Sequence, residues 1–263
     1  MIGQKDNLKR LNPLPLLTIL YGLPGSGRWT LLSTIAKEQG YTPIKTNGDI
    51  DTIRGLVAIT NTDNKNLYVI NNDDLGLPSA NTLLKSTEEG IGNVRFAIKA
   101  TTNNVLPTLK SRATMLKMEP YTDEEQEKIV KQFTSSQSDY DLLSSLFVTP
   151  GQILGLINQE GGIKYATGIV SLVANLANCD YGDIVSVFDT LDFKGTDIAR
   201  LPVGLFLLTF ARALWNKYTD LDNAKMYRVW GQLNTTWARY TARRVDMVRA
   251  ITAMLLNISA ILG

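Results

Sequence analysis

A glycine-rich stretch at residues 22–30, Gly-Leu-Pro-Gly-Ser-Gly-Arg-Trp-Thr, has residue types and spacing that could surround a phosphate group. Four residues separate Gly22 from Gly27, as in the phosphate loop (Walker A motif), whose backbone N–H groups and following helix bind phosphate oxygens. In that motif a lysine next reaches the β and γ phosphates, and a serine or threonine holds Mg²⁺. Here Arg28 and Trp29 stand at those two positions, so the glycines occur without the lysine and the metal-binding hydroxyl.

A second candidate lies at residues 67–74, Leu-Tyr-Val-Ile-Asn-Asn-Asp-Asp, where an apolar run ends in polar residues. A Walker B strand has this pattern, but Asn71 and Asn72 occupy the places where an Asp-Glu pair is expected. A neutral amide offers Mg²⁺ no charged oxygen and cannot act as a base toward water, and an ATPase needs both functions. The two stretches together indicate an NTPase fold that does not hydrolyse nucleotide.

Both stretches also have a purely structural interpretation. A turn from a strand into a helix favours glycine without any ligand, and two asparagines can simply end a buried strand. From these two stretches we take the following residues as the candidate nucleotide-binding set of a degenerate site: Gly22, Gly25, Ser26, Gly27, Arg28, Trp29, Thr30, Asn71 and Asn72.

The elements that must position these residues alternate between strands and helices in the first half of the chain. Apolar runs predict strands at 15–23, 41–46, 66–71, 94–101 and 113–118. Helical patterns separate them at 29–39, 50–58 and 78–89. Buried strands that alternate with helices predict a parallel sheet covered on both faces, so the fold class is α/β.

From residue 121 onward the sequence predicts helices and no strand. The first of them has Thr122 as its N-cap candidate, followed by acidic residues in its first turn. Gly161-Gly162 is the best candidate for a boundary between two helical parts. The expected helices are 123–134, 139–147, 151–159, 163–178, 181–191, 197–218, 222–240 and 242–260.

Composition excludes several classes of chemistry. The 263 residues include no histidine, which removes every mechanism that needs an imidazole base. Cys179 is the single cysteine, so we expect no intrachain disulfide, no cysteine-based metal site and a reducing, cytoplasmic location. No apolar run reaches ~18 residues, so we expect no membrane span. The net charge of +2 neither demands nor excludes nucleic acid.

Five blocks, in their order and spacing, resemble the clamp-loader branch of the AAA+ proteins, and most closely its bacterial delta-prime subunits of DNA polymerase III. The likeness covers residues 14–160 by motif and the remainder by architecture. The blocks are residues 20–27, 50–56, 67–74, 79–89 and 106–113. The resemblance implies an AAA+ P-loop domain at 1–120, a small helical lid at 121–161 and an all-helical collar for oligomerisation at 162–263.

The resemblance also implies roles for single residues. Ser111-Arg112 resembles the family's Ser-Arg-Cys motif, with Ala113 in the place of the cysteine. In such proteins this arginine reaches the ATP site of a neighbouring subunit, so Ser111 and Arg112 become the catalytic candidates, with Arg112 as a trans arginine finger. Thr102 matches the sensor position after the fourth strand, and Gly151 stands where active family members carry a sensor arginine. The alternative for Arg112 is an ordinary surface arginine before an edge strand.

The function implied is that of a non-hydrolysing, stator-like subunit of a sliding-clamp loader in DNA replication. Such a subunit needs no cofactor of its own, because partner subunits bind the ATP and Mg²⁺. Its partners are an AAA+ ATPase subunit, the sliding clamp and primer-template DNA. The short chain and the missing cysteine-rich zinc module indicate a divergent member, for which a phage genome is one possible origin.

Two alternatives stay open at this stage. The first is an active ATPase that loads a clamp or a helicase, with Thr30 or Ser26 serving the magnesium. The second is a clamp-loader mimic that binds host replication proteins and redirects them. Turnover of ATP by the pure chain separates the first alternative from a stator. A gene neighbourhood with a polymerase and another AAA+ protein would favour a clamp loader, whereas an isolated gene would favour the mimic.

Overall fold

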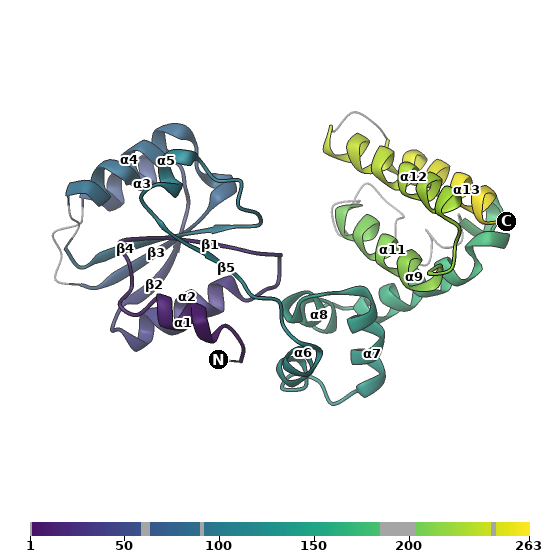
Figure 1. The fold of residues 1–263 in the computed structure, drawn as a ribbon, viewed down its shortest axis with the longest axis horizontal. Helices are drawn as coiled ribbons and strands as arrows, with labels where there is room; N and C mark the ends of the chain where they lie inside the picture. Colours follow the sequence, from purple (N-terminus) through teal and green to yellow (C-terminus); the bar gives the residue numbers. More distant parts are fainter. Residues whose placement is uncertain (1, 59–63, 90–91, 185–202, 243–245) are drawn as a thin grey trace. The chain divides into compact units, whose positions relative to one another are not determined.

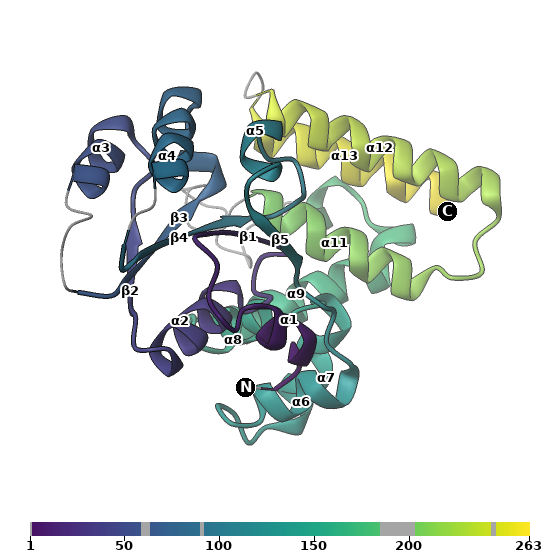
Figure 2. The same ribbon diagram turned by 60° about the vertical axis from the view of Figure 1, so that its left-hand side comes forward.

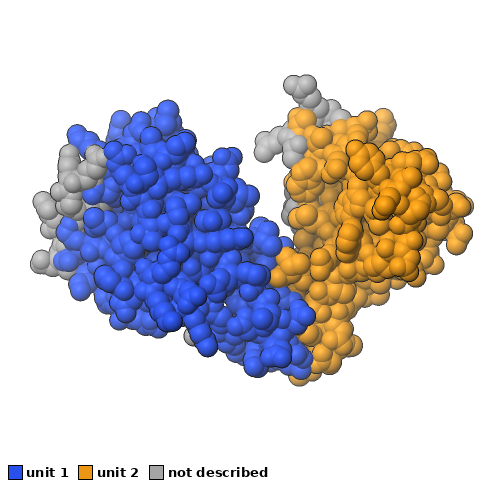
Figure 3. All heavy atoms as spheres, in the orientation of Figure 1, with its two compact units in different colours: residues 1–132, 149–152 blue, residues 133–148, 153–263 orange. Residues whose placement is uncertain are grey.

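The computed structural model describes residues 2–58, 64–89, 92–184, 203–242 and 246–263 (Figure 1). By its internal contacts the chain forms two compact units (Figure 3). Unit 1 comprises Met1–Gln132 and Thr149–Gln152, and unit 2 comprises Phe133–Val148 and Ile153–Gly263. The three domains expected from the sequence, with boundaries after residues 120 and 161, stay a prediction.

Unit 1 is built on a five-stranded sheet in which every pairing is parallel. The strand order is β2-β3-β4-β1-β5. The ends of each strand lie within two residues of the predicted ends. The apolar runs predict the strands well because residues on both faces of a covered sheet are buried. The strands are β1 (Leu17–Tyr21), β2 (Thr42–Thr46), β3 (Asn66–Asn71), β4 (Val94–Ala100) and β5 (Thr114–Lys117). The predicted α/β class with a parallel sheet is therefore confirmed.

Helices cover both faces of this sheet (Figures 1 and 2). On one face α3 (Ile50–Ala58), α4 (Leu77–Glu89) and the short α5 (Pro107–Lys110) bury a core with Phe96 and Ile98 of β4. On the other face α2 (Arg28–Glu38) buries a second core with alternate strand residues. Successive residues of a strand point to opposite faces, so β1, β3, β4 and β5 contribute to both cores, while β2 contributes Ile44 to the first.

The first helix, α1 (Lys5–Arg10), was not predicted from the sequence, because Leu8 is its only apolar residue. Its buried side chains are Gln4 and Asn7, which bond to the edge strand and the residues after it. Gln4 Nε2 donates to the carbonyl of Glu119 at 2.7 Å, and Asn7 Nδ2 donates to the carbonyl of Lys117 at 2.8 Å. Amide side chains therefore form hydrogen bonds with backbone carbonyls at and just after the edge strand β5. Because these bonds are polar, α1 has no apolar periodicity that would predict it.

Residue 117 ends the last strand, and the described residues beyond it contain helices only. Thr122 is confirmed as the N-cap of the first of them: its hydroxyl accepts from the N–H of Glu125 at 3.2 Å, and Glu125 accepts from Thr122 in return. No described helix has the length and apolar character needed to cross a membrane. The helices are α6 (Asp123–Val130), α7 (Gln137–Leu146), α8 (Pro150–Ile157), α9 (Gly162–Asn175), η2 (Leu176–Asn178), α11 (Val203–Lys217), α12 (Asn223–Thr241) and α13 (Met247–Leu262).

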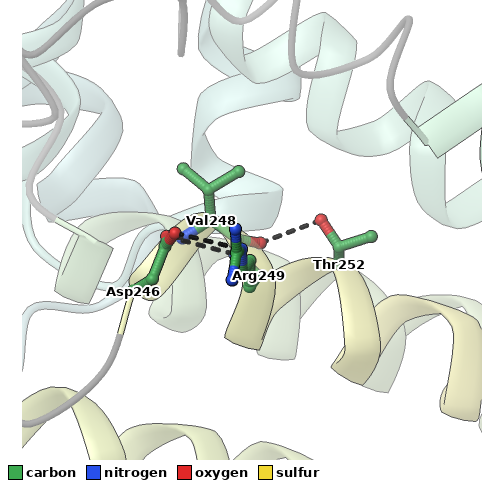
Figure 4. Close-up of polar contacts among 4 residues, drawn as sticks. All are labelled: Asp246, Val248, Arg249 and Thr252. Carbon is green, nitrogen blue, oxygen red and sulfur yellow. Dashed lines mark hydrogen bonds and ion pairs between the residues drawn. The ribbon is translucent and has the colours of Figure 1, made fainter.

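Three of the predicted helical ranges differ from the described helices. Most of the helix predicted at 181–191 lies outside the described residues, as does the start of the one at 197–218. The last helix begins at Met247 instead of residue 242, because Asp246 caps it (Figure 4). One Asp246 carboxylate oxygen accepts from the N–H of Val248 at 3.0 Å and from that of Arg249 at 3.4 Å.

Candidate functional site

The glycine loop connects β1 to α2 at the carboxyl edge of the sheet, which is where a phosphate loop lies in a P-loop fold. Gly25 has φ 77° and Gly27 has φ 84°, in the left-handed region that favours glycine. Gly22 packs against Met118, and a Cβ at Gly22 would lie 2.7 Å from the Met118 Cβ. The three glycines of the predicted motif therefore each have a local backbone or packing reason.

Arg28, in the position of the phosphate-loop lysine, turns toward the sheet. Its guanidinium Nη1 donates to the carbonyl of Ala100, the last residue of β4. Burial lowers the pKa of Arg28 from its ordinary value, and the nearby Asp73 carboxylate acts in the opposite direction. The side chain is thus half-buried at the end of the sheet, within electrostatic range of one carboxylate.

Trp29 and Thr30 diverge at the start of α2. Trp29 is partly buried and packs on the core beneath α2, where the Lys45 ammonium lies 4.6 Å from the centre of its ring. Thr30 is exposed, and its carbonyl accepts from the hydroxyl of Ser33 at 3.1 Å. Ser26 is 5% exposed, and among the described residues its hydroxyl has no hydrogen-bond partner.

Asn71 ends β3, and Asn72 begins the 3₁₀-helix η1 (Asn72–Asp74). The Asn71 side-chain amide donates to a carboxylate oxygen of Asp74 at 3.0 Å. Asn71 is therefore held by a neighbouring acid, in the position where a Walker B aspartate would face a metal ion. The described residues contain no group of three or more Cys, Asp and Glu side chains that could hold one.

Two lysines lie on the strands that neighbour β3, and neither was predicted from the sequence as part of the site. Lys99 of β4 pairs with Asn71, and Lys45 of β2 pairs with Val69. Paired residues of parallel strands point to the same face, and Val69 belongs to the core under α2, so both lysines share that face with Asn71. Their signal in the sequence is a lysine just before the end of each predicted strand.

The charges at this edge act on one another. The pKa of Lys99 is lowered by burial, then by the positive charges of Arg28 and Lys45, while Asp74 raises it. Three cations from β2, β4 and α2 therefore converge on the carboxyl edge, with Asp73 and Asp74 as the neighbouring anions. A divalent cation placed among them would be repelled, whereas an anion would be attracted.

The remaining candidates lie away from the loop. Thr102 is exposed in the bend after β4, where its hydroxyl accepts from the N–H of Asn104 at 3.2 Å. Ser111 and Arg112 form the exposed turn between α5 and β5, and the Ser111 hydroxyl donates to the carbonyl of Thr108 at 2.9 Å. Since α5 packs on the face opposite α2, the Ser-Arg turn and the glycine loop are not brought together within this chain.

The whole chain resembles solved structures of the AAA+ P-loop fold. A DNA polymerase III gamma subunit-related protein from Thermotoga maritima matches 99% of this chain and 100% of its own, with a TM-score of 0.61 at 15% identity. The RuvB Holliday junction branch migration motor of Thermotoga maritima matches 94% of this chain and 83% of its own, with a TM-score of 0.51 at 17% identity. No protein-family model and no curated protein matches the sequence. The likeness shows that the chain has this fold, as its sequence predicts.

Proposed function

We propose that this protein is a non-hydrolysing subunit of a sliding-clamp loader in DNA replication, and that Arg112 acts on the ATP of a neighbouring subunit. The observation that carries the first part is the set of charges around Asn71. A catalytic edge needs carboxylates for Mg²⁺ and a base for water, whereas here the neutral Asn71 pairs with Lys99, on which the charges of Arg28 and Lys45 also act.

Magnesium-bound ATP does not fit this set of donors. Neither amide at 71–72 is a charged ligand, and Trp29, in place of the metal-binding hydroxyl, packs on the core instead. The two nearby carboxylates are engaged otherwise: Asp74 accepts from Asn71, and Asp73 lies near the Arg28 guanidinium. We therefore assign no step of ATP hydrolysis to residues of this chain.

The second part of the proposal is supported by the position of the Ser-Arg turn. Arg112 is exposed at the end of a four-residue helix, so its side chain is accessible to another protein. A guanidinium stays charged at any physiological pH, and its planar fork matches two phosphate oxygens. A subunit without its own hydrolysis would contribute to ATP turnover through such a residue. Its partners would be an AAA+ ATPase subunit, the sliding clamp and primer-template DNA.

The first test measures ATP turnover by the purified chain, which we expect at background. Removal of one well-placed electrostatic contact typically costs ~10²–10³ in rate, and several are missing here. Turnover that disappears in an Arg28→Ala variant would show that the chain hydrolyses ATP itself, and the active-ATPase alternative would then replace the stator. Turnover that survives this substitution reports a contaminant.

The second test uses the complex reconstituted with its AAA+ partner, clamp and primed DNA. Arg112→Ala should leave assembly intact and lower the stimulated ATPase, since a trans arginine is worth ~10³–10⁵ at its own site. Arg112→Lys should restore little, because an ammonium cannot copy the fork. Arg54→Ala is the matched control: Arg54 is exposed on α3, with Asp51 3.9 Å away. Equal ATPase in the Arg112→Ala and Arg54→Ala complexes would favour the mimic.

A further inference from the structure

The first turn of α8 and a nearby tyrosine bind the glycine loop through three consecutive carbonyls. The Thr149 hydroxyl donates to the carbonyl of Pro24 at 2.8 Å, and the N–H of Gly151 donates to that of Gly25 at 3.0 Å. The Tyr121 hydroxyl donates to the carbonyl of Ser26 at 3.0 Å. Thr149 and the first residues of α8, up to Gln152, belong to unit 1 together with the loop, although the rest of the helix belongs to unit 2.

Two glycines make this contact possible. A Cβ added to Gly151 would lie 2.6 Å from the carbonyl oxygen of Gly25 and 2.7 Å from its Cα. A Cβ added to Gly25 would lie 2.5 Å from the Thr149 hydroxyl and 2.6 Å from the backbone nitrogen of Gln152. These are mostly backbone atoms, which cannot swing aside as the end of a flexible side chain can. The two backbones therefore touch only because neither residue has a side chain.

Two residues of this contact are buried, whereas Pro24 and Gly25 of the loop are exposed. Thr149 is 4% exposed and Ser26 is 5% exposed. The Thr149 hydroxyl also lies 2.8 Å from the side-chain amide of Gln152. Because a hydroxyl has one proton, both contacts are satisfied when Gln152 presents its NH₂ group and Thr149 donates to Pro24. Of the three residues whose carbonyls accept, Ser26 is buried, so loss of its donor should cost more than loss of a donor at the exposed Pro24 or Gly25.

We propose that Thr149–Gln152 and Tyr121 form a latch that fixes the glycine loop in its conformation without a nucleotide. The three hydrogen bonds and the Gly25–Gly151 contact hold the loop through its own backbone, so its order does not depend on a bound phosphate. The latch is independent of the clamp-loader assignment, because it rests on contacts inside unit 1 alone. The latch connects the glycine loop to the first turn of α8.

The test compares two glycine-to-alanine substitutions in the same helix. In the full-length chain, hydrogen exchange of residues 22–28 and 149–152 is followed by mass spectrometry. Gly151→Ala should raise the exchange rate in both segments roughly tenfold, since it removes the closest contact and displaces at least one hydrogen bond. Gly155→Ala should leave the rates unchanged, because a Cβ at Gly155 meets nothing within 4 Å. Equal rates in the two variants would overturn the latch.

Two further measurements keep the proposal testable if Gly151→Ala fails to fold. Thr149→Val keeps the volume of the side chain but leaves the Pro24 carbonyl without its donor, so loop exchange should rise several-fold. ATP with magnesium added to the wild-type chain should leave loop exchange unchanged. Unchanged exchange in Thr149→Val would overturn the latch, and a tenfold slowing on addition of ATP would show that nucleotide orders the loop. Neither outcome bears on Arg112, so this test and that of the proposed function can fail separately.

Discussion

Tyr165 of α9 and Thr209 of α11 form a buried hydrogen bond within unit 2, and its strength can be measured. Tyr165 is 4% exposed and Thr209 is 1% exposed, with 2.9 Å between the two hydroxyl oxygens. The Thr209 hydroxyl lies 2.9 Å from the carbonyl of Leu205 and 3.1 Å from that of Phe206, so its proton goes to the helix backbone. Tyr165 is therefore the donor in the pair, and Thr209 accepts.

The two single substitutions should differ in cost. Thr209→Val leaves the Tyr165 hydroxyl buried without an acceptor, which costs ~1–3 kcal/mol of unfolding free energy. Tyr165→Phe removes the donor while Thr209 still bonds to the backbone, so it should cost only about 1 kcal/mol. The double variant should lose less unfolding free energy than the sum of the two single variants, because it leaves no buried hydroxyl without a hydrogen-bond partner.

The pair also predicts a dependence on alkaline pH. Burial raises the pKa of Tyr165 to about 12, whereas the unfolded value is near 10.0. A raised pKa in an acid stabilises the folded state fully below the unfolded pKa, and this stability is lost as the pH rises through the folded pKa. By pH 11 the wild type should have lost ~1.4 kcal/mol that the Tyr165→Phe variant does not lose.

Urea unfolding followed by tryptophan fluorescence between pH 8 and pH 11 measures both effects, because Trp215 and Trp230 lie on α11 and α12 of the same unit. The pKa values of Tyr121 and Tyr218 are also raised by burial, but these residues are present in both proteins and cancel in the comparison. The reasoning is refuted if the difference between wild type and Tyr165→Phe is constant with pH, or if Thr209→Val costs less than Tyr165→Phe.

Three further substitutions test the charges at the sheet edge and the N-cap of α6. Lys99→Met should raise the midpoint of thermal unfolding at neutral pH, because it removes a half-buried charge that Arg28 and Lys45 repel. This gain should shrink in high salt, which screens the repulsion, and as the pH rises through the lowered pKa of Lys99. An unchanged midpoint would mean that the three cations do not interact. Thr122→Ala should cost ~1 kcal/mol of stability by removing the capping box of α6, as should Glu125→Ala, and a loss from only one of them would contradict the reciprocal bonds.

The sequence predicted the sheet well because each strand carries its own local signal. Short apolar runs with helical patterns between them mark the five strands and α2, α3 and α4 without any knowledge of their neighbours. The short α5 and the polar α1 were missed, since four residues show no period and α1 is held by amide bonds to a strand more than a hundred residues away. Local patterns cannot report stabilisation that comes from distant backbone groups.

The candidate site was predictable only in part, for the same reason. The loop and the end of β3 were identified from adjacent residues, but Lys45 and Lys99 surround Asn71 only because β2 and β4 are the neighbours of β3. Strand order is a property of the fold, and no spacing along the chain encodes it. The contact of Gly151 with Gly25 joins residues that are still further apart in the sequence. The family resemblance identified Gly151 only as the residue that replaces a sensor arginine.

These contacts change what a glycine loop implies about nucleotide. Gly22 is required by Met118, Gly25 by its positive φ and by the first turn of α8, and Gly27 by its own positive φ, so all three glycines are explained without a ligand. The spacing of glycines is therefore weak support for phosphate binding in this chain. The side chains at the carboxyl edge decide its chemistry, because they determine whether a divalent cation is attracted or repelled there. Lys99 beside the neutral Asn71, with Arg28 and Lys45 acting on Lys99, disfavours such a cation, which is why the proposed function assigns hydrolysis to a neighbouring subunit.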